Sequence, residues 1–188
     1  MIGTTQVATY DRTFRWLHWG MASLIIALIS AIEIKGSVPK GDLKHFLMTL
    51  HKQAGLLVFG FVWLRLIWRV THHHASEIQP YLSTGMKLVA NLAHVALYLL
   101  MIGMPLLGVL ALQAQGKDAD FFGWVLPVLL DEESGLPYAL KLKTAHEWAG
   151  NVLIGLAGLH IAAALFHHWI RRDNTLIRML GGVIATKK

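Results

Sequence analysis

The chain has 188 residues, of which 55% are apolar and only 15% are charged, and its mean hydropathy of +0.50 is too high for an ordinary water-soluble domain. The absence of cysteine excludes disulfides, thiolate metal ligands and covalently attached haem. The net charge of +6 does not indicate nucleic-acid binding, because the basic residues flank apolar runs instead of following one polar face. Composition therefore predicts one small integral membrane domain over residues 1–188.

Four apolar stretches each reach or exceed the roughly 20 residues that a helix needs to cross a bilayer core. They cover residues 15–35, 49–70, 86–112 and 144–170. The segment before the first stretch lacks the apolar core and small-residue cleavage site of a secretory signal, so we expect no cleavable leader. The pattern predicts an all-α, integral membrane four-helix bundle.

The connection between the third and fourth stretches contains the apolar run FFGWVLPVLL. This run is too short to span the bilayer, so we expect it to lie in the membrane interface or to cap the bundle. Tryptophans near the ends of the predicted helices are typical of the aromatic belt at membrane surfaces. They are Trp16, Trp19, Trp68, Trp148 and Trp169.

Four crossings place both termini on the same side of the membrane, and the distribution of charge indicates which side. The side with the termini carries ten basic and three acidic residues, whereas the opposite side carries seven basic and eight acidic residues. Because basic residues are enriched on the cytoplasmic side of membrane proteins, this asymmetry predicts that both termini are cytoplasmic.

Two histidines, His146 and His160, stand fourteen residues apart in the fourth predicted helix. Fourteen helical residues rise about 21 Å and return to nearly the same face, so this helix presents two imidazoles at different depths. His51 enters the second helix from the outer side, and His18 enters the first helix from the inner side. Depth therefore predicts an outer pair, His51 with His146, and an inner pair, His18 with His160. Two imidazoles on facing helices are suited to clamping a haem.

Each of these four histidines is followed four residues later, on the same helix face, by a small residue that leaves room for a flat macrocycle. The four small residues are Ala22, Gly55, Gly150 and Ala164. A lone membrane histidine can also simply hydrogen-bond a neighbouring helix, but four at matched depths favour two haem sites. HEWAG begins like the zinc motif H-E-x-x-H, but Gly150 stands where the second histidine belongs, so no zinc protease is predicted.

Several motifs resemble those of the bacterial four-helix di-haem cytochrome b561 proteins, which include the superoxide oxidase type. They are HW at 18–19, LHKQAG at 50–55, LAHVALYLL followed by MIGMPLLG, and the run from HEWAGNVLIGLAGLHIAAALFHHW to RRDNTLIRM. The resemblance covers nearly the whole chain. It implies two b haems in a bacterial inner membrane, the inner one ligated by His18 and His160 and the outer one by His51 and His146.

The same resemblance implies quinone-linked electron transfer and, in one branch of the family, oxidation of periplasmic superoxide with ubiquinone as the acceptor. His167 occupies the position that this branch uses at its quinone site; the alternative is an interfacial pair, His167 and His168, that binds nothing. The chain departs from that branch in Lys52, directly after a proposed ligand, and in the triple His72–His74. We favour a solvated loop over a metal-binding tract for the triple.

Basic residues at each level are candidates for pairing with anionic haem propionates. They are Arg12, Arg15, Arg65 and Arg69 for the inner haem and Lys52, Lys141 and Lys143 for the outer one. Anchoring of helix ends at the lipid headgroups is the alternative role. For His94 we weigh a quinone pocket against a hydrogen bond to a backbone carbonyl, and favour the carbonyl.

The sequence thus predicts a di-haem membrane cytochrome that couples a periplasmic donor, with superoxide as one candidate, to ubiquinone. A small anion would be drawn to the outer lysines Lys44, Lys52, Lys141 and Lys143, although eight acids share that side. One alternative is a haem-binding relay subunit that serves a separate soluble redox partner. Another is a haem-free transporter or chaperone whose histidines bind metal.

Overall fold

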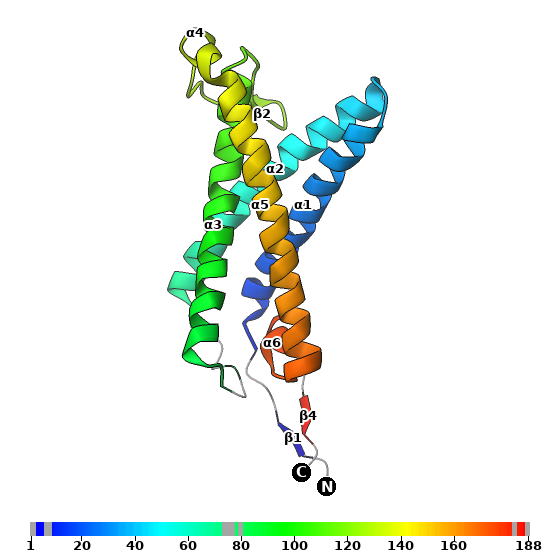
Figure 1. The fold of residues 1–188 in the computed structure, drawn as a ribbon, viewed down its shortest axis with the longest axis vertical. Coiled ribbons are helices and arrows are strands. Elements are labelled where there is room, and N and C mark those ends of the chain that lie inside the picture. The colour runs from blue at the N-terminus through cyan, green and yellow to red at the C-terminus, as the bar shows by residue number, and fades with distance from the viewer. Residues whose placement is uncertain (1–2, 6–8, 73–77, 79–80, 182–183, 187–188) are drawn as a thin grey trace.

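Four long helices run the length of the molecule in a computed structural model of the chain (Figure 1). The structure describes residues 3–5, 9–72, 78, 81–181 and 184–186. The long helices are α1 (Arg12–Ser37), α2 (Asp42–Thr71), α3 (Thr84–Gln113) and α5 (Ala139–Phe166). The four corresponding segments are long and apolar enough to cross a membrane, which confirms the predicted all-α membrane architecture.

Each helix begins before its apolar stretch, because polar residues cap and extend it outside the bilayer core. The Asp11 carboxylate accepts a hydrogen bond of 2.9 Å from the backbone N–H of Phe14 and so caps α1. The Ser83 hydroxyl caps α3 in the same way, through the N–H of Met86.

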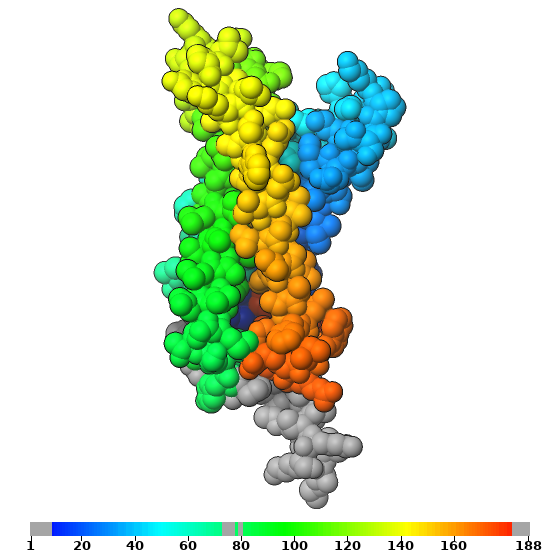
Figure 2. Space-filling model, in the orientation of Figure 1, coloured from blue at the N-terminus to red at the C-terminus, as the bar shows by residue number. Residues whose placement is uncertain are grey.

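The helices pack as two pairs that share one buried layer. α1 packs against α2 and α3 packs against α5, while α2 joins the two pairs by contacting α3. A core of apolar side chains fills the middle of the bundle; it comprises Met21, Val58, Val62, Tyr98, Met101 and Leu153. Above this layer the α1–α2 pair diverges from α3 and α5, and Figure 2 shows the resulting notch.

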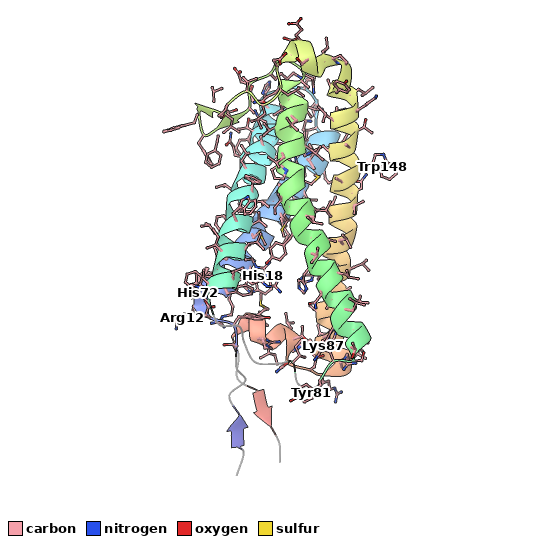
Figure 3. The ribbon with its side chains drawn as sticks, turned by 90° about the vertical axis from the view of Figure 1, so that its left-hand side faces the viewer. Arg12, His18, His72, Tyr81, Lys87 and Trp148 are labelled. Carbon is pink, nitrogen blue, oxygen red and sulfur yellow. The ribbon has the colours of Figure 1, made fainter. Side chains whose placement is uncertain are left out.

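Helix α3 is bent along its length (Figure 3). Pro105 lies inside this helix and supplies a physical cause, because proline has no N–H to donate and its ring crowds the preceding turn.

The connection from α3 to α5 forms no spanning helix, as predicted. It contains a hairpin of β2 (Asp120–Phe121) and β3 (Trp124–Val125), in which Asp120 pairs with Val125. A short helix α4 (Glu132–Gly135) and a 3-10 turn η1 (Leu136–Tyr138) then lead into α5. We call the end that carries this hairpin the outer end. Phe122, Trp124 and Val128 leave their side chains 65%, 82% and 68% exposed there, which suits a segment lying in the membrane interface.

The opposite, inner end carries both termini. After α5 the chain makes a π-helical turn η2 (His167–Arg171), passes through left-handed Arg172, and continues as α6 (Thr175–Leu180) beneath the bundle. β1 (Gly3–Thr5) then pairs antiparallel with β4 (Ile184–Thr186), so the two ends of the chain lie side by side (Figure 1).

The cytoplasmic location of the inner end is a prediction from charge that single-cysteine variants can test, because the chain has no cysteine of its own. Lys87→Cys lies at the start of α3 on the inner end, and Asp118→Cys lies beside the outer hairpin. We expect a membrane-impermeant maleimide to label Asp118→Cys in intact spheroplasts and to label Lys87→Cys only after permeabilisation. The opposite pattern would place the termini outside.

Candidate functional site

Helices α2 and α5 bring His51 and His146 together near the outer end. Their ring centres lie 6.1 Å apart, and the ring planes meet at 83°. Nδ1 of His51 lies 3.0 Å from the carbonyl oxygen of Leu28 on α1, and Nδ1 of His146 lies 3.1 Å from that of Met104 on α3. A neutral imidazole that donates from Nδ1 carries its free lone pair on Nε2. Contacts with all four helices thus position this pair, and Nε2 of each ring is suited to metal ligation.

Helices α1 and α5 bring His18 and His160 together at the inner level, where Figure 3 shows His18 within the bundle. Their ring centres lie 6.3 Å apart, with an angle of 64° between the planes. Nδ1 of His18 is buried and has no hydrogen-bond partner. Because an unsatisfied buried polar atom costs free energy, this ring has bonding capacity that the protein alone does not use.

The separations within both pairs fit two imidazoles on opposite sides of one iron. A ring nitrogen lies about 2 Å from a bound metal and about 1.1 Å from the centre of its own ring, so trans imidazoles have centres about 6 Å apart. The observed 6.1 and 6.3 Å match that value. Among the described residues, no three histidine, aspartate or glutamate side chains gather into a group that could hold a metal ion.

A cavity of about 440 Å³ opens between the diverging helices and is lined by both histidines of the outer pair. This volume is in the range of cofactor sites. Gly55 and Gly150 line it as well, and a Cβ at Gly55 would meet no atom within 4 Å. A Cβ at Gly150 would lie 3.4 Å from the Met104 side chain. Gly55 and Gly150, two of the predicted small residues, therefore line the outer cavity, and larger side chains at these positions would narrow it.

Gly108 on α3 is a further residue of the outer site, which sequence reasoning missed. A Cβ there would lie 3.2 Å from Cε1 of His146, so a larger residue would crowd the ring and require it to shift by a few tenths of an ångström. The spacing of small residues along the histidine helices gives no sign of it, because Gly108 makes room for a ring on another helix.

Arg65 is a buried basic residue at the inner level. Its side chain is 8% exposed, and Cζ lies 4.9 Å from the centre of the Phe14 ring and 5.5 Å from that of Tyr98. No carboxylate of the described residues pairs with it, and its Nε has no hydrogen-bond partner. A buried cation without a counter-ion is costly, so this position fits an anionic group such as a haem propionate. Arg69, one turn further along α2, is exposed.

The other two arginines predicted at this level lie elsewhere. Arg12 and Arg15 line a groove between α1 and α6, on the outside of the bundle. They are not placed beside the inner histidine pair.

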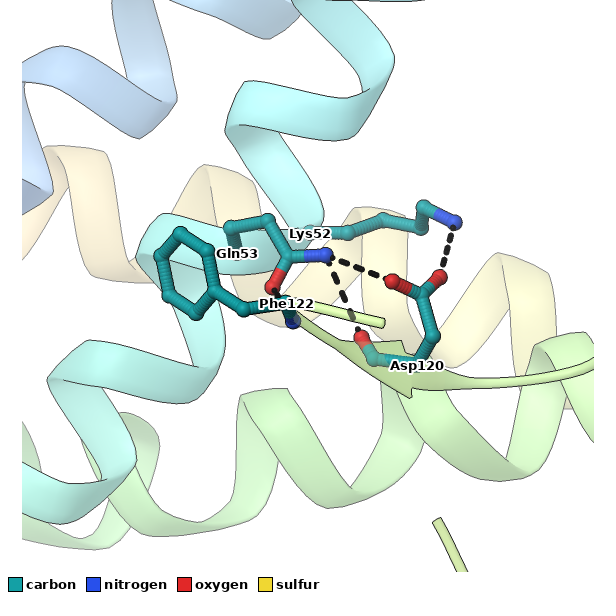
Figure 4. Close-up of polar contacts among 4 residues, drawn as sticks. All are labelled: Lys52, Gln53, Asp120 and Phe122. Atoms are coloured by element: carbon teal, nitrogen blue, oxygen red, sulfur yellow. Dashed lines mark hydrogen bonds and ion pairs between the residues drawn. The ribbon is translucent and has the colours of Figure 1, made fainter. Parts of the chain in front are cut away.

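Lys52 and Gln53 hold the hairpin over the outer cavity (Figure 4). Nζ of Lys52 lies 3.3 Å from the Asp120 carboxylate. The Gln53 amide donates to the same carboxylate at 2.9 Å and to the Asp120 carbonyl, and accepts from the N–H of Phe122 at 3.0 Å. The bond from Lys52 lowers the pKa of Asp120, and the Gln53 bond adds to this although burial opposes it. The charge of Lys52 is therefore balanced by Asp120.

The four outer lysines do not form one cluster. Lys52 and Lys143 line the outer cavity, and Lys143 pairs with Glu147 at 3.2 Å. Lys44 donates to the Val38 carbonyl, and Lys141 lies 6.0 Å from the Tyr138 ring. Two lysines that the sequence did not single out, Lys35 and Lys117, do line the cavity, because they come from other segments that the fold brings there.

His167 lies at the inner end of α5, where its Nδ1 is 2.5 Å from a carboxylate oxygen of Asp173. The Asp173 side chain is fully buried and also accepts from the backbone N–H of Thr175 at 3.0 Å. Burial alone would raise the pKa of Asp173, but the hydrogen bonds from His167 and Thr175 outweigh it and lower that pKa. Sequence reasoning missed Asp173, because the contact depends on the π-helical turn and on left-handed Arg172.

Two further histidines have structural partners. Nδ1 of His94 lies 2.7 Å from the carbonyl oxygen of Ala90. This contact is the hydrogen bond to a backbone carbonyl that we favoured for His94 from the sequence. The ring centre of His94 is 5.4 Å from that of His160. His72 stacks on Trp68 with ring centres 3.5 Å apart. The other two members of the triple, His73 and His74, lie outside the described residues.

Residues 9–182 match the model of a family described as prokaryotic cytochrome b561. The chain belongs to this family. It is 33% identical over 172 residues to "Cytochrome b561 homolog 1" of Escherichia coli, covering 91% of this chain and 96% of that protein. It is 29% identical to "Probable superoxide oxidase CybB" of Yersinia pestis, covering 87% and 91% of the two chains. It is also 32% identical to "Cytochrome b561 homolog 2" of Escherichia coli, covering 89% and 87%.

Membership shows a membrane protein that binds b-type haem and transfers electrons. The resemblance read from the sequence motifs is thereby confirmed. The ring separations in the two imidazole pairs are compatible with that haem chemistry.

The hydrogen bonds of Gln53 to Asp120 and Phe122 predict the effect of Gln53→Ala. This change removes three hydrogen bonds and leaves the N–H of Phe122 without its acceptor, so we expect a loss of about 1–3 kcal/mol in unfolding free energy. Thermal unfolding of the purified protein measures it. Gln115→Ala, which loses one hydrogen bond to the Ala111 carbonyl and one from Lys117, is the control. Equal losses of unfolding free energy in the two variants would show that the Gln53 contacts do not stabilise the protein more than those of Gln115.

Proposed function

We propose that this cytochrome b561 is a di-haem oxidoreductase of the bacterial inner membrane that passes electrons from a periplasmic donor to ubiquinone. His51 and His146 ligate the outer haem, and His18 and His160 ligate the inner one. The observation that carries the proposal is the presence of two imidazole pairs, each at the separation of a bis-histidine iron site. The cytoplasmic location of the termini, proposed from charge, makes the outer end periplasmic.

The remaining groups at each level support the same assignment. Gly55 and Gly150 leave space beside the outer pair, and the carbonyls of Leu28 and Met104 orient its rings. Arg65 offers an uncompensated positive charge near the inner pair. Haem held by these two pairs would supply one-electron chemistry. The histidines that α5 contributes to the two pairs, His146 and His160, lie about 21 Å apart along the helix.

The outer rim supports a small anionic donor, of which superoxide is the proposed example. Four lysines line the cavity, against three carboxylates: Lys35, Lys52, Lys117 and Lys143 against Glu33, Asp120 and Glu147. The excess of one positive charge favours anions only modestly. Two superoxide anions would each lose one electron and leave as dioxygen, and one ubiquinone would take up the two electrons with two protons.

His167 is the proposed proton-handling residue for ubiquinone at the inner end. Asp173 accepts a hydrogen bond from its Nδ1, so the carboxylate orients the ring and stabilises it when it carries a second proton. Nε2 is then the atom left to exchange a proton with a quinone oxygen. His167 follows His160 by seven residues, which places it about 10 Å further along the same helix.

A second candidate function is relay of electrons for a separate soluble partner. The observation behind this alternative is the exposed apolar side chains of the outer hairpin, with Trp124 82% exposed, which could contact a partner protein in place of the membrane interface. Such a subunit would need its partner before it could reduce quinone.

The ligand assignment predicts that His51→Ala removes one of two haems. Haem per chain, measured as pyridine haemochromogen, should fall from about two to about one, and the remaining haem should keep its bis-histidine spectrum. His45→Ala, an exposed histidine of the same helix, should keep both haems. Loss of both haems or of neither in His51→Ala would contradict the pairing of His51 with His146.

The proposed reaction predicts ubiquinone reduction by the purified protein alone when a superoxide generator is supplied. His167→Gln and Asp173→Asn should each slow this reduction at least about tenfold while haem content is unchanged, because proton transfer to quinone loses its donor or its orienting group. His168→Gln, a change of the neighbouring histidine, should have little effect. No reduction above the uncatalysed rate by the unmodified protein would favour the relay function, and equal losses in all three variants would remove the role of His167.

A further inference from the structure

A groove of about 470 Å³ lies between α1 and α6 on the outside of the bundle at its inner end. Its walls combine two arginines, two tryptophans and two apolar residues: Arg12, Arg15, Trp16, Trp19, Met179 and Leu180. The indole N–H of Trp19 donates to the carbonyl of Met179 at 3.0 Å and so holds α6 against α1. The groove is separate from the haem sites, because the opposite face of α1 contributes the buried Phe14 and Met21 to the bundle.

The two arginines of the groove have no protein counter-ion among the described residues. No carboxylate lies within ion-pair distance of Arg12 or Arg15, and Nε of Arg15 is buried without a hydrogen-bond partner. The neighbouring acid, Asp11, directs its carboxylate elsewhere, to the N–H of Phe14 and the indole of Trp68. Among the described residues, then, neither guanidinium group of this groove has an anionic partner, so an anionic ligand could pair with both.

The same groove also exposes apolar surface. The Trp16 side chain is 77% exposed and that of Leu180 is 58% exposed, beside the arginines. A ligand that satisfies both features carries an anionic group next to a hydrocarbon chain. Figure 3 shows Arg12 at the inner end of the bundle, across from Lys87, which is the depth at which tryptophans and basic residues meet lipid headgroups.

We propose that this groove binds the headgroup phosphate of an anionic phospholipid, with Arg12 and Arg15 on the phosphate and Trp16, Trp19 and Leu180 against the glycerol and the first acyl carbons. Guanidinium groups bind phosphate oxygens in paired hydrogen bonds, and basic pockets beside membrane helices are suited to such headgroups. The lipid would link α6 to α1 and so stabilise the inner end of the bundle.

The test uses the haem-loaded protein in detergent and measures its melting temperature. Short-chain phosphatidylglycerol should raise the melting temperature saturably, whereas phosphatidylcholine and inorganic phosphate at equal concentrations should not. The double variant Arg12→Gln/Arg15→Gln should bind phosphatidylglycerol at least about tenfold more weakly. Lys87→Gln, which removes a positive charge at the same depth on α3, should bind it like the unmodified protein.

Several results would overturn the proposal. Equal shifts with phosphatidylcholine would show that the groove does not recognise the anionic headgroup, and equal shifts with inorganic phosphate would show a free anion site. Unchanged lipid affinity in the double variant would show that the two arginines do not bind the lipid. Loss of haem from this variant would indicate that they bind a haem propionate instead. Arg12→Gln alone changes an exposed side chain and preserves folding, so it should still weaken binding about threefold if the double variant does not fold.

Discussion

The fold depends on placing ionisable imidazoles inside a membrane bundle, where each nitrogen without a hydrogen-bond partner costs free energy. In hydrocarbon, water is not present to complete a hydrogen bond, so each buried polar atom needs a partner from the protein or from a bound group. The outer pair meets this requirement at Nδ1 through carbonyls of α1 and α3. The remaining nitrogens are suited to one metal between the rings, as the proposed function requires.

The two levels of the bundle have different surroundings. The outer level opens into a cavity whose rim carries balanced charges and a clamped hairpin. The inner level carries the His167–Asp173 pair and the buried Arg65, which has no carboxylate partner among the described residues. Leu153, halfway between His146 and His160 on α5, belongs to the apolar core that separates the levels. This arrangement suits exchange with a small water-soluble donor at one end and with a membrane-dissolved acceptor at the other, as the proposed function requires.

Charge balance at the outer end bears most directly on the choice of donor. A free Lys52 would make the cavity mouth strongly attractive to anions, but Asp120 pairs with it and Glu147 pairs with Lys143. Strong electrostatic steering needs an extended region of one sign, and the rim has only one positive charge in excess. Lys52 therefore contributes to positioning of the hairpin as well as to the local field.

The sequence by itself determined the four spanning helices, the two levels of histidine and the pairing of His18 with His160 and of His51 with His146. These follow from hydropathy and from the rise of about 1.5 Å per helical residue, both of which are local properties of the chain. Only the tertiary structure decided which charged side chains form ion pairs and which have no partner among the described residues. Asp120 reaches Lys52 across 68 positions of sequence, Gly108 makes room for a ring on another helix, and Arg15 faces α6 instead of the inner histidines. Such contacts depend on how helices rotate and cross, because side chains distant in sequence meet only after the bundle has packed.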